Sequence, residues 1–278
     1  MTRYLLFLLM AALGARAGMR SDVEFARPGG TPLHLDAFVP EGAGPFPACI
    51  LVHGGAFMKG DKRSFITPLF EPLGRAGFAW FSIDYRLAPH HRFPACVEDV
   101  EAAIRWVKAH AADFKVDPHR LALVGESAGG HLVSLAGVRA AGDTRVAAVV
   151  PFYAPHDLES RVRASASVPV WLGALFGLTE TNEATWKVLR DASPLHHVRP
   201  GLAPYLLVHG TKDDKVPLDQ SLRFQEKTKA AGNRCDLIVI EGGAHGMGGW
   251  EKIDPGYREK MVAWLREVLV ATAPGRDP

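Results

Sequence analysis

A serine in the middle of the chain has the surroundings of a nucleophile. Residues 125–129 read GESAG, which has the form G-x-S-x-G, and the apolar run Leu121–Val124 before them predicts a strand. The residues after Ser127 have helical spacing. A sharp strand-to-helix turn of this form lifts the serine oxygen out of the sheet. The simpler alternative is a serine that caps a helix, but the position between a strand and a helix favours a nucleophile.

A second glycine-containing turn could supply hydrogen-bond donors to a reacting oxygen. Residues 53–57 read HGGAF and follow the apolar run Ala48–Val52. Glycines allow backbone N–H groups to approach a substrate closely, and such donors stabilise the oxyanion of a tetrahedral intermediate. We therefore predict an oxyanion hole formed by the N–H groups of Gly55, Ala56 and Ala128. His53 is interpreted as a brace for this loop.

A serine nucleophile needs a general base, and His245 has the position for one. It lies in the glycine-rich stretch GGAHG, directly after the apolar run Leu237–Ile240, which predicts a strand. The carboxyl ends of parallel strands share one edge of a sheet, so His245 is expected near Ser127. We interpret His131, which lies on the helix after Ser127, as structural.

The base in turn needs an acid to orient it, and in this chain order the acid lies between the serine and the histidine. The stretch 209–217 reads HGTKDDKVP and follows the predicted strand Tyr205–Val208. Asp213 and Asp214 are both candidates, and spacing alone does not separate them. With either acid, the chemistry is acyl transfer through a serine, and it requires neither a metal nor an organic cofactor.

The elements that must position these residues alternate between strands and helices. Strands are predicted at 33–39, 48–52, 77–83, 121–124, 146–152, 205–208 and 237–240, and helices at 94–112, 127–140, 217–231 and 257–271. This alternation predicts an α/β fold with a mostly parallel central sheet and helices on both faces.

Residues 154–203 interrupt the alternation and are expected to form a small cap-like insertion over the sheet. Trp171, Leu175 and Phe176 lie among polar residues there and could cover an acyl pocket. The pair His196-His197 also belongs to this insertion, so neither histidine is expected to be the base.

The N-terminal segment 1–17 has the layout of a secretory signal peptide. Arg3 gives it a basic start, an apolar run of ten residues follows, and Ala15 and Ala17 are small residues at alternate positions. The run is too short to span about 30 Å of hydrocarbon. We predict cleavage after Ala17, a single domain over 18–278, and a secreted or periplasmic location with no stable membrane insertion after cleavage.

Composition excludes several classes of protein. The 278 residues are 47% hydrophobic and 22% charged, which is typical of a globular protein rather than a disordered one. The formal charge is only +2, and Arg3 and Arg16 of the predicted signal peptide account for it, so nucleic acid is not an expected partner. Three cysteines are too few for a disulfide scaffold and have no zinc-site spacing, although one pair could bridge.

These motifs resemble those of the α/β-hydrolase superfamily, and in particular the BD-FAE and hormone-sensitive-lipase-like bacterial carboxylesterases. The resemblance covers nearly all of residues 22–272 and rests on HGGAF (53–57), DYRLAPHHRFPACVEDV (84–100), AAIRWVKAHAADFKVDPHRLALVGESAGGH (102–131), HGTKDDKVP (209–217) and GGAHGM (242–247). The family pattern H-G-x-x-D-x-x-V-P implies that Asp213 is the acid, with Asp214 as the alternative.

The resemblance implies a carboxylic ester hydrolase that acts on short acyl esters or on acyl groups linked to a polysaccharide. Alternatives are a peptidase, an arylformamidase-type amide hydrolase, or a non-catalytic binding module. Two departures from relatives matter. Ala56 stands where many relatives have a third glycine, although its N–H remains, and the aromatic pair of formamidase-like HGGYW motifs is absent.

Overall fold

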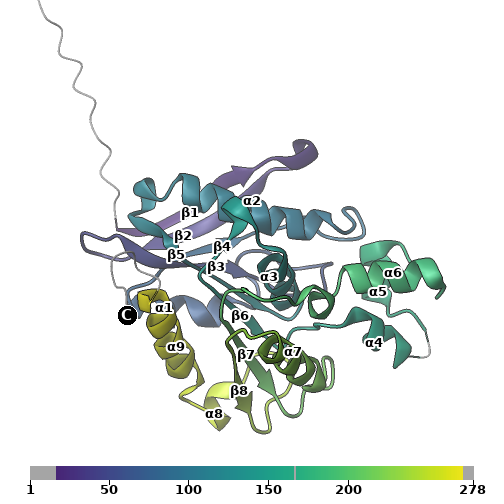
Figure 1. Cartoon of the computed structure of the whole chain (residues 1–278). Coiled ribbons are helices and arrows are strands. Elements are labelled where there is room, and N and C mark those ends of the chain that lie inside the picture. The colour runs from purple at the N-terminus through teal and green to yellow at the C-terminus, as the bar shows by residue number, and fades with distance from the viewer. Residues whose placement is uncertain (1–16, 166, 272–278) are drawn as a thin grey trace, which may run out of the picture.

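One eight-stranded sheet forms the centre of the protein, as seen in the computed structural model, which describes residues 17–165 and 167–271 (Figure 1). The strands are β1 (Gly18–Ala26), β2 (Leu33–Val39), β3 (Phe46–Val52), β4 (Ala79–Ile83), β5 (Val116–Glu126), β6 (Ala148–Phe152), β7 (Tyr205–Gly210) and β8 (Cys235–Ile240). Their order is β1-β2-β4-β3-β5-β6-β7-β8. β2 is antiparallel to both of its neighbours, and β4, β3 and β5 to β8 pair in parallel.

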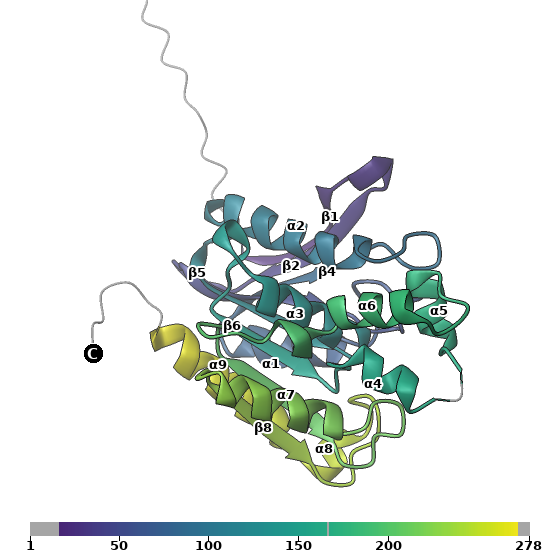
Figure 2. The same cartoon turned by 45° about the vertical axis from the view of Figure 1, so that its right-hand side comes forward.

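Helices cover both faces of this sheet (Figures 1 and 2). They are α1 (Phe70–Arg75), α2 (Ala95–Ala109), α3 (Ala128–Arg139), α4 (Leu158–Arg163), α5 (Val170–Phe176), α6 (Glu183–Asp191), α7 (Asp219–Ala230), α8 (Trp250–Ile253) and α9 (Tyr257–Ala271). α2, α3 and α7 pack on one face, and α1, α8 and α9 pack on the other. This confirms the predicted α/β-hydrolase architecture.

The apolar strands contribute to two cores because successive side chains point to opposite faces. In β3, Ile50 and Val52 join the core beneath α2 and α3, whereas Cys49 and Leu51 join the core beneath α9. A strand covered on both faces therefore reads as a continuous apolar run, which is why β3, β4, β6 and β7 were visible in the sequence.

Three short helices, α4, α5 and α6, form most of the connection between β6 and β7 and lie together on one side of the molecule (Figures 1 and 2). They enclose a small apolar cluster of Leu158, Val162, Leu172, Leu189 and Ala192. The expected cap-like insertion is therefore a packed unit of helices that stands beside the sheet edge.

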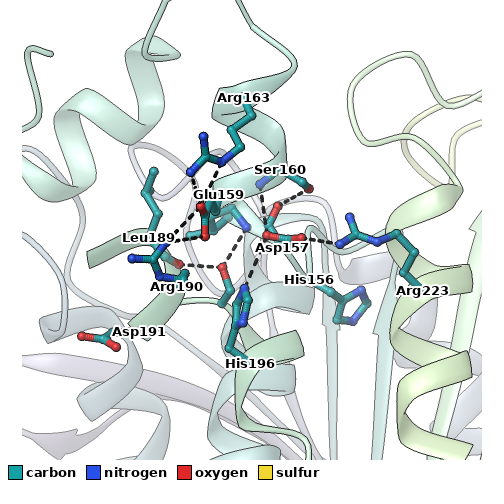
Figure 3. Close-up of polar contacts among 12 residues, drawn as sticks. His156, Asp157, Glu159, Ser160, Arg163, Leu189, Arg190, Asp191, His196 and Arg223 are labelled. Carbon is teal, nitrogen blue, oxygen red and sulfur yellow. Dashed lines mark hydrogen bonds and ion pairs between the residues drawn. The ribbon is translucent and has the colours of Figure 1, made fainter. Parts of the chain in front are cut away.

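Polar contacts fix the first of these helices in place (Figure 3). The Asp157 carboxylate caps α4 by accepting from the Ser160 N–H at 3.1 Å, and it also pairs with Arg223 of α7 at 2.7 Å. Glu159 accepts from Arg163 within α4 and from Arg190 of α6. These contacts join α4 to both neighbouring helices.

The structure differs from the predicted elements in two main places. β1 was not predicted, because Phe25 is its one buried residue and no apolar run marks it. β5 begins at Val116, five residues before the predicted start, because its first part is polar and carries the Asp117–Arg120 ion pair at 2.8 Å. The predicted helices are confirmed, with ends that are up to three residues shorter.

Two further observations concern the cysteines and the length of the helices. Cys49, Cys96 and Cys235 are all buried free thiols, so no pair of them forms a bridge. Within residues 17–165 and 167–271, no helix has the length and apolar character needed to cross a membrane.

Candidate active site

Ser127 occupies a strained turn between β5 and α3. Its φ is 52° and its ψ is −114°, outside the regions that L-residues normally adopt, and such strain is concentrated at functional sites. Its hydroxyl makes no cap hydrogen bond to the helix, so it does not act as the ordinary capping serine. Instead Ser127 Oγ lies 3.0 Å from His245 Nε2.

The glycines around Ser127 permit direct contact between backbones. A Cβ on Gly125 would collide with the carbonyl of Gly129, and a Cβ on Gly129 would collide with the carbonyls of Val52 and His53. The start of α3 therefore rests against the loop that follows β3. This contact explains why position 129 holds a glycine.

His245 connects the serine to an acid. The imidazole lies in the loop after β8, and its Nδ1 is 2.7 Å from Asp213 Oδ2. Asp214, the alternative acid, instead pairs with Lys215 at 3.1 Å, with both side chains exposed. Ser127, His245 and Asp213 thus meet at the carboxyl ends of β5, β8 and β7.

The Asp213 carboxylate is fully buried and is held in its ionised form. Its Oδ1 accepts from the backbone N–H groups of Lys215 and Val216 at 2.9 and 2.8 Å. His209 Nε2 lies 3.4 Å from Oδ2. Burial alone would raise the pKa of Asp213, but the hydrogen bonds from His209, His245 and Val216 outweigh it and hold the pKa well below its usual value.

Tyr153 and Glu126 form a buried pair next to these residues. The Tyr153 ring meets the His245 ring edge-on, with centroids 4.8 Å apart. Burial raises the pKa of the Glu126 carboxyl, against the lowering effect of hydrogen bonds from Gly54 N–H and the Tyr153 hydroxyl. Glu126 therefore joins the serine turn to the loop after β3.

The loop after β3 presents unused backbone donors. Gly55, Ala56 and Phe57 have φ values of 105°, 55° and 63°. In the part of the chain that the structure describes, the N–H groups of Gly55, Ala56 and Ala128 donate to no other residue. The left-handed conformation of Ala56 gives a physical reason why a glycine would suit this position.

Two buried histidines and a tyrosine contact this loop and its neighbours. His53 Nδ1 lies 2.7 Å from the Gly54 carbonyl, and its ring stacks on Tyr85 with centroids 4.4 Å apart. His131 Nδ1 lies 2.8 Å from the Pro155 carbonyl, and its ring meets Phe57 edge-on. Both histidines therefore have structural contacts and lie outside the His245–Asp213 pair.

A cavity of about 790 Å³ opens beside the serine. Its wall includes Gly55, Ala56, Ser127 and His245. Its apolar part comes from Phe65, Pro68, Tyr153, Pro155, Trp171, Val216 and Met247, and its charged part from Lys59, Glu126, Arg161, Asp214 and Lys215.

The predicted cap residues divide into two groups. Trp171 lines the cavity and stacks on Phe57 with centroids 5.7 Å apart. Leu175 is buried in the main core instead, and Phe176 packs against Phe93, so the expectation that these two cover the pocket is wrong.

Sequence reasoning missed several residues of the site. Glu126 stands in the variable position of G-x-S-x-G, and Tyr153 and His209 lie at the ends of β6 and β7. A polar or aromatic residue at the carboxyl end of a parallel strand is a usable signal, and it would have found the latter two. Arg161 has no such signal, because its place at the cavity depends on how α4 packs.

A protein metal site normally needs several ligating side chains close together. Among residues 17–165 and 167–271, no group of three or more histidine, cysteine, aspartate or glutamate side chains is arranged to hold a metal ion.

The mostly parallel sheet, with a strained serine turn at its carboxyl edge, defines an α/β-hydrolase fold. Within that class the chain belongs to the BD-FAE family, whose profile matches residues 35–228.

Several similar proteins of known name are esterases. The esterase LipC of Mycobacterium tuberculosis is 34% identical over 73% of this chain and 53% of LipC. The chain spans about half the length of the curated relatives it matches.

Solved structures extend the similarity over nearly the whole chain. A truncated carbohydrate esterase from gut microbiota has a TM-score of 0.81 and 26% identity, covering 93% of this chain and 99% of that one. The butyrate-bound esterase Est2 of Thermogutta terrifontis has a TM-score of 0.72 and 28% identity, covering 94% and 97%.

Proposed function

We propose that this protein hydrolyses carboxylic esters through an acyl-enzyme formed on Ser127. The observation that carries the proposal is the continuous contact from Ser127 Oγ to His245 Nε2 at 3.0 Å and from His245 Nδ1 to Asp213 Oδ2 at 2.7 Å. A nucleophile, a base and an orienting acid in hydrogen-bond contact are the parts that acyl transfer needs.

In the first step His245 Nε2 takes the hydroxyl proton as Ser127 Oγ attacks the ester carbonyl carbon. Asp213 holds Nδ1–H and stabilises the imidazolium that forms. The imidazolium then protonates the leaving alcohol oxygen as the carbonyl–oxygen bond breaks. Water, deprotonated by the same imidazole, attacks the acyl-enzyme and restores the serine.

The oxyanion formed in each step accepts hydrogen bonds from the N–H groups of Gly55, Ala56 and Ala128. Each such donor lowers the barrier by about 3 kcal/mol in acyl-transfer enzymes. The support for this role is that these three amides donate to no other described residue.

The proposed substrates are esters with a short acyl group, free or attached to a polysaccharide. A cavity of about 790 Å³ holds more than a small acyl group, so it leaves room for part of the alcohol. Phe65, which is 52% exposed and has a strained φ of 60°, offers a ring at the cavity for that part. The names of the similar esterases support the same classes.

Residues 1–17, of which only Ala17 belongs to the described part of the chain, are proposed to direct export. β1 begins at Gly18, so removal of the segment after Ala17 would leave the strand whole. The proposed location is secreted or periplasmic.

Ser127→Ala is the decisive test of the chemistry. We expect kcat/KM for para-nitrophenyl acetate to fall by at least about three orders of magnitude, and covalent labelling by a fluorophosphonate probe to disappear. Amide and formamide substrates assayed alongside separate an esterase from the amide-cleaving alternatives. Full activity in the Ser127→Ala variant would overturn the proposal.

A further inference from the structure

Arg161 brings a positive charge to the wall of the cavity, and the Asp213 carboxylate attracts it from beyond ion-pair distance. Its side chain extends from α4 and lines the cavity together with Ser127 and His245. Within the described part of the chain, no carboxylate lies within 4 Å of its guanidinium. An unpaired guanidinium in a cavity wall is costly unless something else satisfies it.

Most of the donors of this guanidinium are unused. Nη2 donates to the Lys215 carbonyl at 2.5 Å, whereas Nε is buried without a hydrogen-bond partner. Nη1 makes no hydrogen bond to a described residue. Burial lowers the pKa of Arg161, because it disfavours the charged form. Arg161 is therefore partly desolvated with one acceptor, the Lys215 carbonyl, and with its buried Nε left unsatisfied.

Unlike Arg161, three other arginines near α4 each form an ion pair with a carboxylate (Figure 3). Glu159 accepts from both Arg163 and Arg190, and Asp157 pairs with Arg223. The acids on and before α4 are thus paired with three arginines that do not line the cavity. The same contacts fix α4, so Arg161 is held at the cavity by a rigid element.

The other charges in the wall do not cancel this one. Lys215 is paired with Asp214 at 3.1 Å. The Glu126 carboxyl already accepts hydrogen bonds from the Gly54 N–H and the Tyr153 hydroxyl. Lys59 adds a second cation without a carboxylate partner among the described residues. The cavity beside the serine is therefore positively charged.

We propose that the preferred substrates are esters that carry a carboxylate, and that Arg161 binds this carboxylate and determines the specificity. Carboxylates match the planar donor array of arginine, and charge-assisted hydrogen bonds of this kind are the strong ones. Lys59 contributes to the same positive potential. The inference rests on the proposed ester hydrolysis and adds the substrate class to it.

Two matched substrate pairs test the inference and show which side of the ester bears the charge. For the acyl side, mono-para-nitrophenyl adipate is compared with the same ester whose distal carboxyl is capped as a methyl amide. For the alcohol side, para-acetoxyphenylacetate is compared with its methyl amide. In the wild type we expect kcat/KM to favour the carboxylate in one pair by about tenfold or more.

Variants on the same helix supply the control. Arg161→Gln should reduce this preference ratio to near one, and Arg161→Lys should keep part of it. Arg163→Gln, which removes a cation that is paired outside the cavity, should leave the ratio unchanged. A structural role for the Arg161–Lys215 contact would instead lower kcat/KM equally for both members of a pair.

The possible results distinguish failure of this inference from failure of the proposed ester hydrolysis. Absence of a carboxylate preference in both wild-type pairs, or a ratio that Arg161→Gln leaves unchanged, would overturn the inference while ester hydrolysis stands. If Arg161→Gln does not fold, the wild-type ratio and the Arg161→Lys ratio still decide. Loss of all ester hydrolysis in the wild type would instead reject the proposed function.

Discussion

Asp213 and the next residue, Asp214, have different surroundings although both carry a carboxylate. Asp213 is fully buried between His245 and His209 and accepts two backbone N–H groups, whereas Asp214 is exposed beside Lys215. Adjacent carboxylates in the sequence therefore have opposite environments.

Asp213→Asn should lower kcat for an activated ester by about four orders of magnitude, because an amide cannot stabilise the imidazolium and favours the wrong tautomer. Asp214→Asn should change kcat by less than about threefold, as expected for an exposed ion pair. Steady-state kinetics on para-nitrophenyl acetate measures both. Equal losses in the two variants would contradict the assignment of the acid.

Glu126 should couple stability to pH. Burial raises its pKa in the folded protein, so the folded state binds this proton more tightly than the unfolded state does. Folding stability from this group is then present below the unfolded-state pKa of about 4.3 and is lost as pH rises through the folded-state pKa.

Glu126→Gln removes that titration. The free energy of unfolding of the variant relative to wild type should therefore increase as pH rises from about 4.3 through the folded-state pKa, and then level off. Urea unfolding across this pH window gives the difference directly. A difference that stays constant or falls with pH would show that burial does not control this carboxyl.

At the scale of elements, the approach of α3 to the loop after β3 sets the geometry of the site. The approach depends on Gly129, since any Cβ there would meet the carbonyls of Val52 and His53. Neither group can move without displacing β3 or α3.

Gly129→Ala should destabilise the protein by more than about 3 kcal/mol or prevent its folding, as overpacking against backbone does. Gly256→Ala is the matched control, because its Cβ would meet only ordinary contacts at 3.7 Å and beyond. Thermal unfolding of the two variants gives the comparison. A Gly129→Ala variant as stable as the control would refute the close approach.

How well each strand could be predicted from the sequence depends on how deeply the strand is buried. Strands buried on both faces, such as β3 and β7, read as apolar runs, and the residues at their carboxyl ends could be placed at one sheet edge. β1 has one buried residue, Phe25, and therefore shows no run of apolar residues. Arg161 was missed because its place in the site depends on how α4 packs, whereas Tyr153 directly follows β6 and could have been found from that position.

At the scale of the whole molecule, the position of the N-terminal strand is compatible with removal of the predicted signal peptide. Gly18 is the first residue of β1 and pairs with Val39 at the sheet edge, directly after the predicted cleavage position. A cleaved protein would therefore keep the entire sheet.

Expressed with its own N-terminus in an exporting bacterial host, the protein should be recovered outside the cytoplasm with Gly18 as its first residue. A basic residue in place of Ala17 should block this cleavage, because the cleavage site requires a small side chain. N-terminal sequencing and intact mass measure both. Protein that stays in the cytoplasm with residues 1–17 attached would contradict the export proposal.

The link between Gly54 and Glu126 constrains how such a chain can be recombined with its relatives. Gly54 donates to the Glu126 carboxyl, and a Cβ on Gly54 would strike that same carboxyl. The two residues therefore constrain each other's identity, although 72 positions separate them. Chimaeras whose crossover falls between them should fail more often than those that exchange both together, which makes that interval a poor place to join parent genes.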